Sequence, residues 1–266
     1  MSPRTQAYRE HQQEKHREVA HLYSIERVRR TVFYRAFNDY YNRLVLSMLP
    51  PDKDAQVLEL MSGSGLLTQA LLAVGYRSLV HVDLSEDMMR LARHDLGAQL
   101  RLCVGDAMRL PFADGTFDVV ICRGGIHHLP SLPAAFAEIF RILRPNGTLL
   151  TYDPCNDAWA GRWLRNAMYR LFDFFDDEHE RGLTSRELRE SCEGAGFRVA
   201  EMRTFGGIGY TVSGMEAHLF PRFFSRLPRL HALGRGLCRV DEALEGWNGL
   251  LAVSMKAVKP AASNGR

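Results

Sequence analysis

Residues 57–65 read Val-Leu-Glu-Leu-Met-Ser-Gly-Ser-Gly, an apolar strand that gives way to a turn of small residues. After Leu66 the pattern becomes helical, and the next apolar stretch ends in Asp83. Glycines let a backbone approach a ligand closely, and a carboxylate at the second strand end can accept hydrogen bonds from two ribose hydroxyls. The stretch therefore predicts a site for a nucleotide cofactor, and the question is which one.

Apolar stretches and helical patterns alternate after this turn. We expect strands at 56–60, 78–83, 99–104, 117–122 and 147–152, and helices at 65–74, 86–95 and 133–143. Ser85 before Glu86 is a good helix start, and Pro145-Asn146-Gly147 is a turn that stops a helix and admits the next strand. The alternation predicts a doubly wound, Rossmann-like α/β fold, in which ligands bind beyond the carboxyl ends of the strands.

The rest of the chain has a different pattern. Charged and aromatic residues at helical spacing predict two helices within 8–49, and further helices are expected at 156–178 and 184–194. Strands at 197–205 and 250–258 complete a mostly parallel sheet of seven, with the last two strands forming an antiparallel edge. We expect four parts: a helical lid (1–54), a cofactor-binding core (55–205), an inserted cap (206–247) and a last strand with a loose tail (248–266).

Composition excludes several classes of protein. The net charge of +3 over 266 residues is too weak to argue for nucleic acid. Five cysteines without a Cys-x-x-Cys pair argue against a disulfide framework or a zinc site, and fit a reducing cytoplasm. The polar N-terminus does not resemble a signal peptide, and no apolar run reaches about 18 residues, the length of a membrane span.

The turn by itself leaves the cofactor open. A dinucleotide fingerprint has glycine or alanine three residues after the second glycine, where this chain has Thr68. That weakens an NAD site without excluding it. A P-loop is excluded because no Gly-Lys-Ser/Thr follows.

Four segments in order resemble the class I S-adenosylmethionine (SAM)-dependent methyltransferases, in particular the small-molecule, type 11-like group. They are Val57–Gly65, Val80–Met88, Val104–Phe112 with Phe117–Cys122, and Leu143–Leu149. The resemblance covers roughly 55–155. One residue departs from it: Met61 occupies the family's usual first glycine, where its side chain would narrow the space around the amino-acid end of the cofactor.

The resemblance implies a set of roles around SAM. Glu59 would orient the methionine end, with the backbone of Gly63 and Gly65 against it. Asp83 would accept from the ribose hydroxyls, and Asp106 from the adenine amino group. The remaining cofactor contacts are expected from Met61, Leu84, Met88, Ala107, Met108 and Arg123. The alternatives are that Asp83 is only a helix cap and that Met88 is only a core residue.

We expect residues at the ends of two strands to carry out the chemistry on the methyl acceptor. His127 and His128 follow the fourth strand, and Asp153 follows the fifth. This arrangement is similar to sugar O-methyltransferases of natural-product pathways, in which the His and Asp positions serve as base and partner. His is the usual base near neutral pH, and His127 is slightly favoured. A His pair also occurs in methyltransferases that act on carbon, where one His only binds backbone or lines the pocket.

Two aromatic-rich segments carry open alternatives. One of Tyr23, Tyr34, Tyr40 and Tyr41 would close over the cofactor, or these tyrosines simply pack against the sheet edge. Residues 219–239 interleave aromatic residues with arginines. That pattern is typical of a basic amphipathic cap that meets a lipid-like substrate or a membrane surface, and equally of an ordinary cap helix with solvated arginines.

The sequence thus predicts SAM-dependent methyl transfer to a small molecule, first of all to a hydroxyl of a natural product or sugar. The alternatives are C-methylation of an isoprenoid or quinone-like substrate, and a non-catalytic SAM-binding or partner-binding module in which Met61 marks a decayed pocket. No metal is expected, and the sequence does not indicate an oligomeric state.

Overall fold

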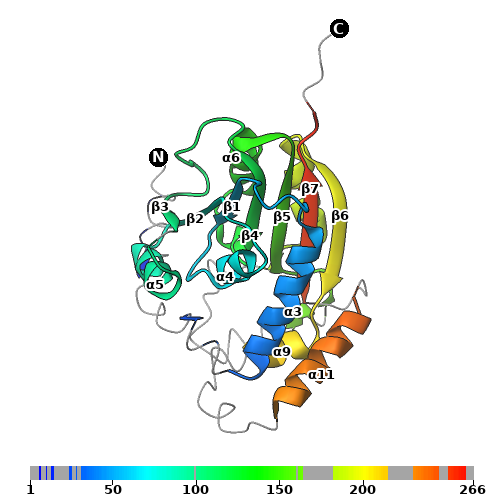
Figure 1. Cartoon of the computed structure of the whole chain (residues 1–266). Helices are drawn as coiled ribbons and strands as arrows, with labels where there is room; N and C mark the ends of the chain where they lie inside the picture. The colour runs from blue at the N-terminus through cyan, green and yellow to red at the C-terminus, as the bar shows by residue number, and fades with distance from the viewer. Residues whose placement is uncertain are drawn as a thin grey trace.

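A seven-stranded sheet runs through the centre of the molecule (Figure 1). The computed structural model describes residues 31–98, 100–159, 161–163, 182–214, 230–245 and 251–261, together with a few single residues before them. The strands are β1 (Val57–Leu60), β2 (Leu79–Asp83), β3 (Arg101–Val104), β4 (Phe117–Arg123), β5 (Leu143–Pro154), β6 (Arg198–Phe205) and β7 (Ala252–Val258). Their order is β3-β2-β1-β4-β5-β7-β6, and only β7 is antiparallel to its neighbours. The predicted mostly parallel, Rossmann-like sheet with an antiparallel last strand is confirmed.

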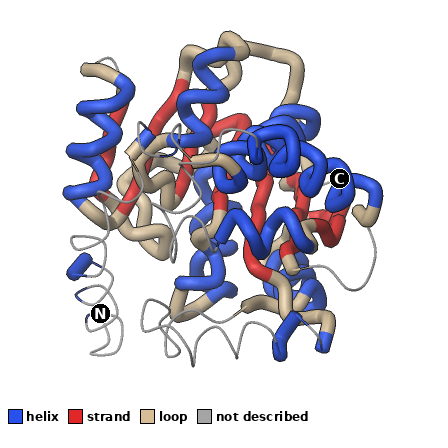
Figure 2. Tube along the Cα trace, turned by 90° about the horizontal axis from the view of Figure 1, so that it is seen from below, coloured by secondary structure: helices blue, strands red, loops and turns tan. Residues whose placement is uncertain are grey.

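Helices cover both faces of this sheet. They are α3 (Phe33–Met48), α4 (Leu66–Ala73), α5 (Glu86–Leu96), α6 (Leu132–Ile142), α8 (Ser185–Gly194), α9 (Ile208–Gly214) and α11 (Leu230–Ala243), with a short 3-10 helix η2 (Ile126–His128). Apolar side chains of α3 and α4 pack on one face, and those of α6 and α8 on the other. Seen from below, the strands lie between helices (Figure 2).

The start of β5 differs from the predicted turn. β5 begins at Leu143, directly after α6, and runs through Pro145-Asn146-Gly147. The turn residues form an irregularity in the pairing with β4, whose register shifts between Phe117 and Val119. Asn146 has a φ of 65°, a left-handed conformation typical of turns, but it lies inside a strand.

α3 packs against the sheet through its aromatic residues. Tyr40 and Tyr41 are buried, and both rings contact Phe205 of β6 with centroids 6.1 Å apart. Tyr41 also lies 4.2 Å from the ring of Tyr152. This burial supports the packing interpretation for these two tyrosines, whereas Tyr23 lies outside the described residues.

The predicted cap is described in part. α9 and α11 lie together beside α3 (Figure 1). The fully buried carboxylate of Asp241 accepts from the backbone N–H of Gly209 at 3.3 Å and of Tyr210 at 3.0 Å. Residues 215–229, and most of the helix predicted over 156–178, lie outside the described residues. Among the residues that are described, no helix is long and apolar enough to span a membrane.

Candidate active site

The predicted cofactor residues lie where β1, β2 and β4 end. β1 pairs in parallel with both β2 and β4, so the direction of winding changes between β1 and β4. Ligands of open α/β sheets bind at such a switch point, outside the carboxyl ends of the strands. The turns that follow these strands therefore define the candidate site.

The turn after β1 has a backbone that glycine favours. Met61, Gly63 and Gly65 have φ values of 54°, 54° and 82°. A Cβ at Gly65 would lie 2.5 Å from a methyl carbon of Leu96, which would have to shift, and the positive φ also disfavours other residues there. A Cβ at Gly63 would meet nothing within 4 Å, so a ligand can approach this backbone. Met61 holds a side chain in a left-handed conformation, which costs about 1–2 kcal/mol.

Asp83 ties this turn to the next strand end. Its Oδ2 accepts from Gly63 N at 2.8 Å, and its Oδ1 accepts from Ser85 N at 2.9 Å. Each carboxylate oxygen has a further lone pair that could accept from a ligand hydroxyl. The N-cap of α5 is Ser85, whose Oγ accepts from Met88 N at 3.3 Å. Met88 is buried and Leu84 is half-buried.

The turn after β3 lies next to the end of β2. Gly105 N donates to the carbonyl of Asp83 at 2.9 Å. Asp106 then accepts from Met108 N through Oδ1, also at 2.9 Å. Ala107 is buried, and Met108 packs against the core. The structure therefore brings the two predicted nucleoside-binding carboxylates to neighbouring strand ends.

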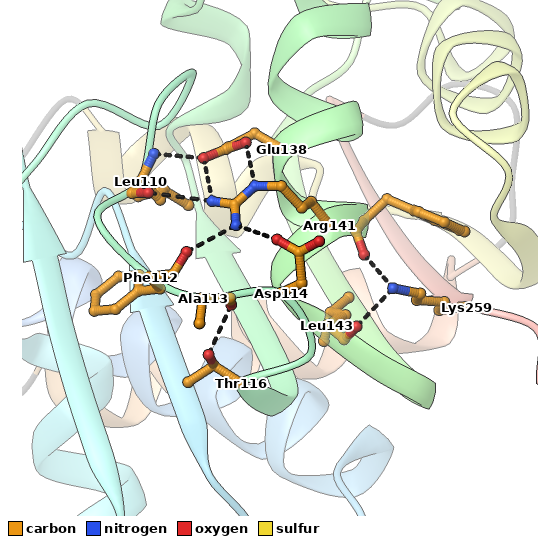
Figure 3. A network of polar contacts seen from close by, with 10 residues as sticks. Leu110, Phe112, Ala113, Asp114, Thr116, Glu138, Arg141, Leu143 and Lys259 are labelled. Carbon is orange, nitrogen blue, oxygen red and sulfur yellow. Dashed lines mark hydrogen bonds and ion pairs between the residues drawn. The ribbon is translucent and has the colours of Figure 1, made fainter.

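Arg141 on α6 anchors the loop that leaves this turn (Figure 3). Its guanidinium binds both oxygens of Glu138 at 2.7 and 2.9 Å, and Asp114 at 2.7 Å. It also donates to the carbonyls of Phe112 at 2.7 Å and Leu110 at 3.2 Å. The Arg141 hydrogen bonds lower the pKa of the Glu138 carboxyl. Sequence analysis missed this anchor, and the i, i+3 spacing of Glu138 and Arg141 was its only signal.

Glu59 is buried beneath the turn after β1, on the face covered by α4. Its Oε2 makes a short hydrogen bond with the Thr68 hydroxyl. Thr68 Oγ1 lies 2.9 Å from His81 Nδ1, and His81 Nε2 lies 3.1 Å from the carbonyl oxygen of Gly63. Burial raises the pKa of Glu59, while His81 and Thr68 lower it. The sequence analysis did not predict this chain of contacts, although His81 was unusual within an apolar strand.

Arg123 places a positive charge at the end of β4. Its guanidinium donates to Asn42 Oδ1 at 3.4 Å and lies 4.8 Å from the centre of the Tyr41 ring. The charge also acts on Glu59, whose pKa it lowers. This end of the site thus combines a carboxyl group with a guanidinium.

His127 and Asp153 form a buried pair. Asp153 Oδ1 accepts from the backbone N of His127 at 3.0 Å and lies 2.9 Å from its ring Nδ1. Asp153 is fully buried; burial raises its pKa, and the hydrogen bond from His127 lowers it. An Nδ1–H that donates to this carboxylate leaves Nε2 with a lone pair, as a general base requires. Of the two predicted histidines, the contact with Asp153 favours His127.

A contact links the turn after β1 to the histidine loop. A Cβ added to Gly125 would lie 2.7 Å from Met61 Cβ and 2.8 Å from Met61 Sδ. Gly125 accepts from the backbone N of His128 at 3.0 Å, and the rings of His127 and His128 lie 3.9 Å apart. Met61 therefore packs under the loop that carries both histidines, which sequence analysis had not predicted.

The residues at this site can bind a ligand that has several polar groups, and they can take up a proton. Three carboxyl groups can accept hydrogen bonds here: Glu59 lies within β1, Asp83 ends β2 and Asp106 follows β3. A His–Asp pair at the end of β5 can take up a proton. Within the part of the chain that the structure describes, no group of three His, Cys, Asp or Glu residues is suited to hold a metal ion.

Comparisons with known proteins agree on one family. A family profile described as a methyltransferase domain matches residues 58–151. The chain is 31% identical over 191 residues to a malonyl-[acyl-carrier protein] O-methyltransferase of Geobacter sulfurreducens, covering 65% of this chain and 71% of that protein. It is 35% identical over 115 residues to the ubiquinone/menaquinone biosynthesis C-methyltransferase UbiE of Dinoroseobacter shibae, covering 41% and 46%.

The similarity to the UbiE relatives is partial, since the chain spans about half the length of each of these proteins (46–51%). Among solved structures, an S-adenosylmethionine-dependent methyltransferase from Mesorhizobium loti superposes with a TM-score of 0.56. That match covers 81% of this chain and 96% of the other, at 16% identity. At this identity the likeness concerns the fold alone.

Proposed function

The chain belongs to the class I SAM-dependent methyltransferases, and from this premise we propose that it transfers a methyl group from SAM to a small-molecule acceptor. The His127–Asp153 pair carries the proposal, because a base in the loop after β4, paired with a carboxylate at the end of β5, has no role in mere cofactor binding. SAM supplies, when bound, a methyl group already activated by a sulfonium.

The strand-end residues fit this cofactor. The open space beside Gly63 admits the methionine end of SAM, and the carboxyl group of Glu59 suits its ammonium. Arg123 suits the methionine carboxylate, because a guanidinium binds carboxylates well. Asp83 suits the ribose hydroxyls, and Asp106 suits the adenine amino group.

The His127–Asp153 pair supplies the base. We propose that His127 Nε2 accepts the hydroxyl proton of the acceptor, while Asp153 holds Nδ1–H and stabilises the imidazolium that forms. Removing this proton makes the acceptor electron-rich, which in-line displacement at the methyl carbon requires. General-base catalysis of this kind contributes about 10²–10⁴ in rate.

We propose an electron-rich quinol-like ring as the acceptor, with methylation at a ring carbon. Two observations support it: the names of the UbiE relatives, and a His127–Asp153 pair of the kind that can ionise a ring hydroxyl. Once the hydroxyl proton is on His127, bound SAM would supply the methyl group to the ring carbon, with S-adenosylhomocysteine as the leaving group. The hydrogen on that carbon would then be lost to solvent as a proton, which restores the aromatic ring, and His127 would return its proton to the ring oxygen.

O-methylation is the second candidate, and the malonyl relative favours it because it aligns with more of the chain. It includes the hydroxyl acceptor of a natural product or sugar that the sequence first predicted. A carboxylate acceptor, in contrast, is already ionised at neutral pH and needs no base. Replacing His127 would then leave turnover almost unchanged.

The test has two stages. Isothermal titration with SAM, S-adenosylhomocysteine (SAH) and NAD comes first: binding of SAM and SAH but not NAD is expected, and no binding of either would favour a non-catalytic module. Incubation with SAM and reduced quinones follows, with product analysis for an acid-stable carbon–methyl bond. His127→Ala is expected to lower turnover at least about a hundredfold. The matched control His128→Ala should retain it, and full turnover in both variants would refute the base.

We also propose contact of 219–239 with a lipid-like acceptor or a membrane surface, because quinones are lipid-soluble. In the described part of this segment Arg235 and Arg239 are exposed on α11. Co-sedimentation with anionic liposomes at low salt tests it, and no binding would remove the membrane version. A cytoplasmic location is proposed from the five free thiols.

A further inference from the structure

Glu59, Thr68 and His81 form a continuous chain of polar contacts under the cofactor turn, and we refer to it as the Glu59 relay. It runs from Glu59 Oε2 through Thr68 Oγ1 to His81 Nδ1, and from His81 Nε2 to the carbonyl oxygen of Gly63. The side chains of Glu59 and His81 are 4% and 1% exposed. Water therefore has little access to correct an unfavourable contact within the relay.

The number of protons in the relay follows from its donors and acceptors. The carbonyl oxygen of Gly63 only accepts, so His81 Nε2 must carry a hydrogen. The Thr68 hydroxyl has a single hydrogen but two close acceptor partners, Glu59 Oε2 and His81 Nδ1. One of these two atoms must therefore carry a hydrogen of its own. An ionised Glu59 beside a neutral His81 leaves one contact as two opposed lone pairs, which is costly in a buried site.

Two arrangements satisfy every contact, and they contain the same number of protons. In the first, Glu59 is protonated and donates to Thr68, which donates to a neutral His81. In the second, Glu59 is ionised, Thr68 donates to it, and an imidazolium at His81 donates to Thr68. We propose that the Glu59 relay holds one shared proton at neutral pH and moves it from Glu59 to His81 when a cation binds against Glu59.

The surroundings favour the neutral arrangement in the free protein. Tyr41 and Cys122 face Glu59 as neutral groups, because burial raises the pKa of each well above its usual value. Arg123 is the cation that faces Glu59 among the described residues, and its hydrogen bond goes to Asn42. Burial outweighs the opposing effect of the Arg123 charge, so the pKa of Glu59 is raised.

Cation binding reverses this balance, and here the inference rests on the proposed function, which places the SAM ammonium against Glu59. The proton of Glu59 passes to Thr68 Oγ1 while the Thr68 hydrogen passes to His81 Nδ1. Glu59 becomes a carboxylate that pairs with the ammonium, and His81 becomes a cation that binds the Gly63 carbonyl more strongly. No proton is exchanged with solvent.

The first test determines which ring nitrogens of His81 carry a hydrogen in the free protein, and it does not depend on SAM binding. Long-range ¹H–¹⁵N correlation spectra distinguish the two neutral imidazole tautomers and the imidazolium, with His81 assigned from the signals lost in His81→Gln. The neutral ring with its hydrogen on Nε2 is expected, and an imidazolium in the free protein would overturn the proposed transfer. The neutral tautomer with its hydrogen on Nδ1 would overturn the relay, whether or not the protein binds SAM.

The second test counts protons on cofactor binding. SAH is titrated by calorimetry at about pH 6.5, where an unperturbed carboxyl group is ionised, in two buffers with different ionisation enthalpies. We expect no proton release for the natural protein or for Thr68→Ser, which keeps the hydroxyl. His81→Gln removes the destination of the proton, so about one proton per SAH should be released.

A merely structural role for His81 would lower affinity without changing this proton count. Release by the natural protein, or no release by His81→Gln, would therefore overturn the proposal. Absence of any SAH binding by the natural protein would instead contradict the proposed function, and the tautomer of His81 would still test the relay.

Discussion

The contact between Met61 and Gly125 predicts how much stability the substitution Gly125→Ala should cost. In Gly125→Ala the new Cβ would lie 2.7 and 2.8 Å from two Met61 atoms and 3.0 Å from the buried Cys122 Sγ. Gly125 has a φ of −128°, which alanine adopts without strain, so the cost comes from the clash. Overpacking of this kind costs about 1–3 kcal/mol. At about 2–4 °C per kcal/mol, the unfolding midpoint should fall measurably.

A double-mutant cycle isolates the contact. Met61→Gly removes both close atoms and relieves the left-handed conformation of Met61. Gly125→Ala should therefore cost about 1–3 kcal/mol less in the Met61→Gly background than in the natural protein. Urea unfolding of the four proteins measures this difference, and no acceptor is needed.

Gly236→Ala serves as the control, because its Cβ would meet nothing within 4 Å. Its effect should add to that of Met61→Gly within about 0.5 kcal/mol, as expected for independent sites. If Gly125→Ala cost the same in both backgrounds, within the same margin, the contact would carry no energy. The argument that Met61 supports the histidine loop would then be refuted.

Further predictions concern the base and the anchor. Asp153→Asn removes a charge-assisted hydrogen bond worth about 1.5–3 kcal/mol, so single-turnover rates should fall about 10–150-fold; an unchanged rate would contradict the role of Asp153 beside His127. Arg141→Lys keeps the charge but not the planar fork, and SAH affinity measured by titration should fall about tenfold, or 1.4 kcal/mol. Because Arg141 lowers the pKa of Glu138, the pair stabilises the fold above the unfolded carboxyl pKa of about 4.3 and loses this as pH falls through the lower folded value. Glu138→Gln should flatten the acid side of the stability curve, measured by urea unfolding at several pH values, and an equally steep curve would argue against this linkage.

Local signals predicted most of the sheet. The alternation of apolar strands with helical patterns depends on neighbouring residues, and the helix start at Ser85 was identified from its own side chain. The start of β5 was wrong because Pro145-Asn146-Gly147 normally ends an element, whereas here pairing with β4 holds these residues inside a strand. Tertiary pairing thus overrode the local preference.

The supporting contacts of the site could not be predicted in the same way. Glu59, Thr68 and His81 come from three different elements, and nothing in their spacing shows that they meet. The same holds for Met61 and Gly125, which are far apart in sequence and come together because β1 and β4 are paired neighbours. Residues that contact a ligand follow motifs, whereas those that position them follow the packing of the fold.

The position of β7 has a consequence for the folding of the chain during its synthesis. β7 follows β6 in the chain but lies between β5 and β6, with antiparallel pairing to both. In the described sheet, β6 has no other strand partner. While the chain is being made, β5 and β6 therefore each present an unpaired edge, the kind of surface through which nascent chains aggregate. Arrival of β7 covers an edge of each strand in one late step, so these edges stay unpaired until β7 has been synthesised.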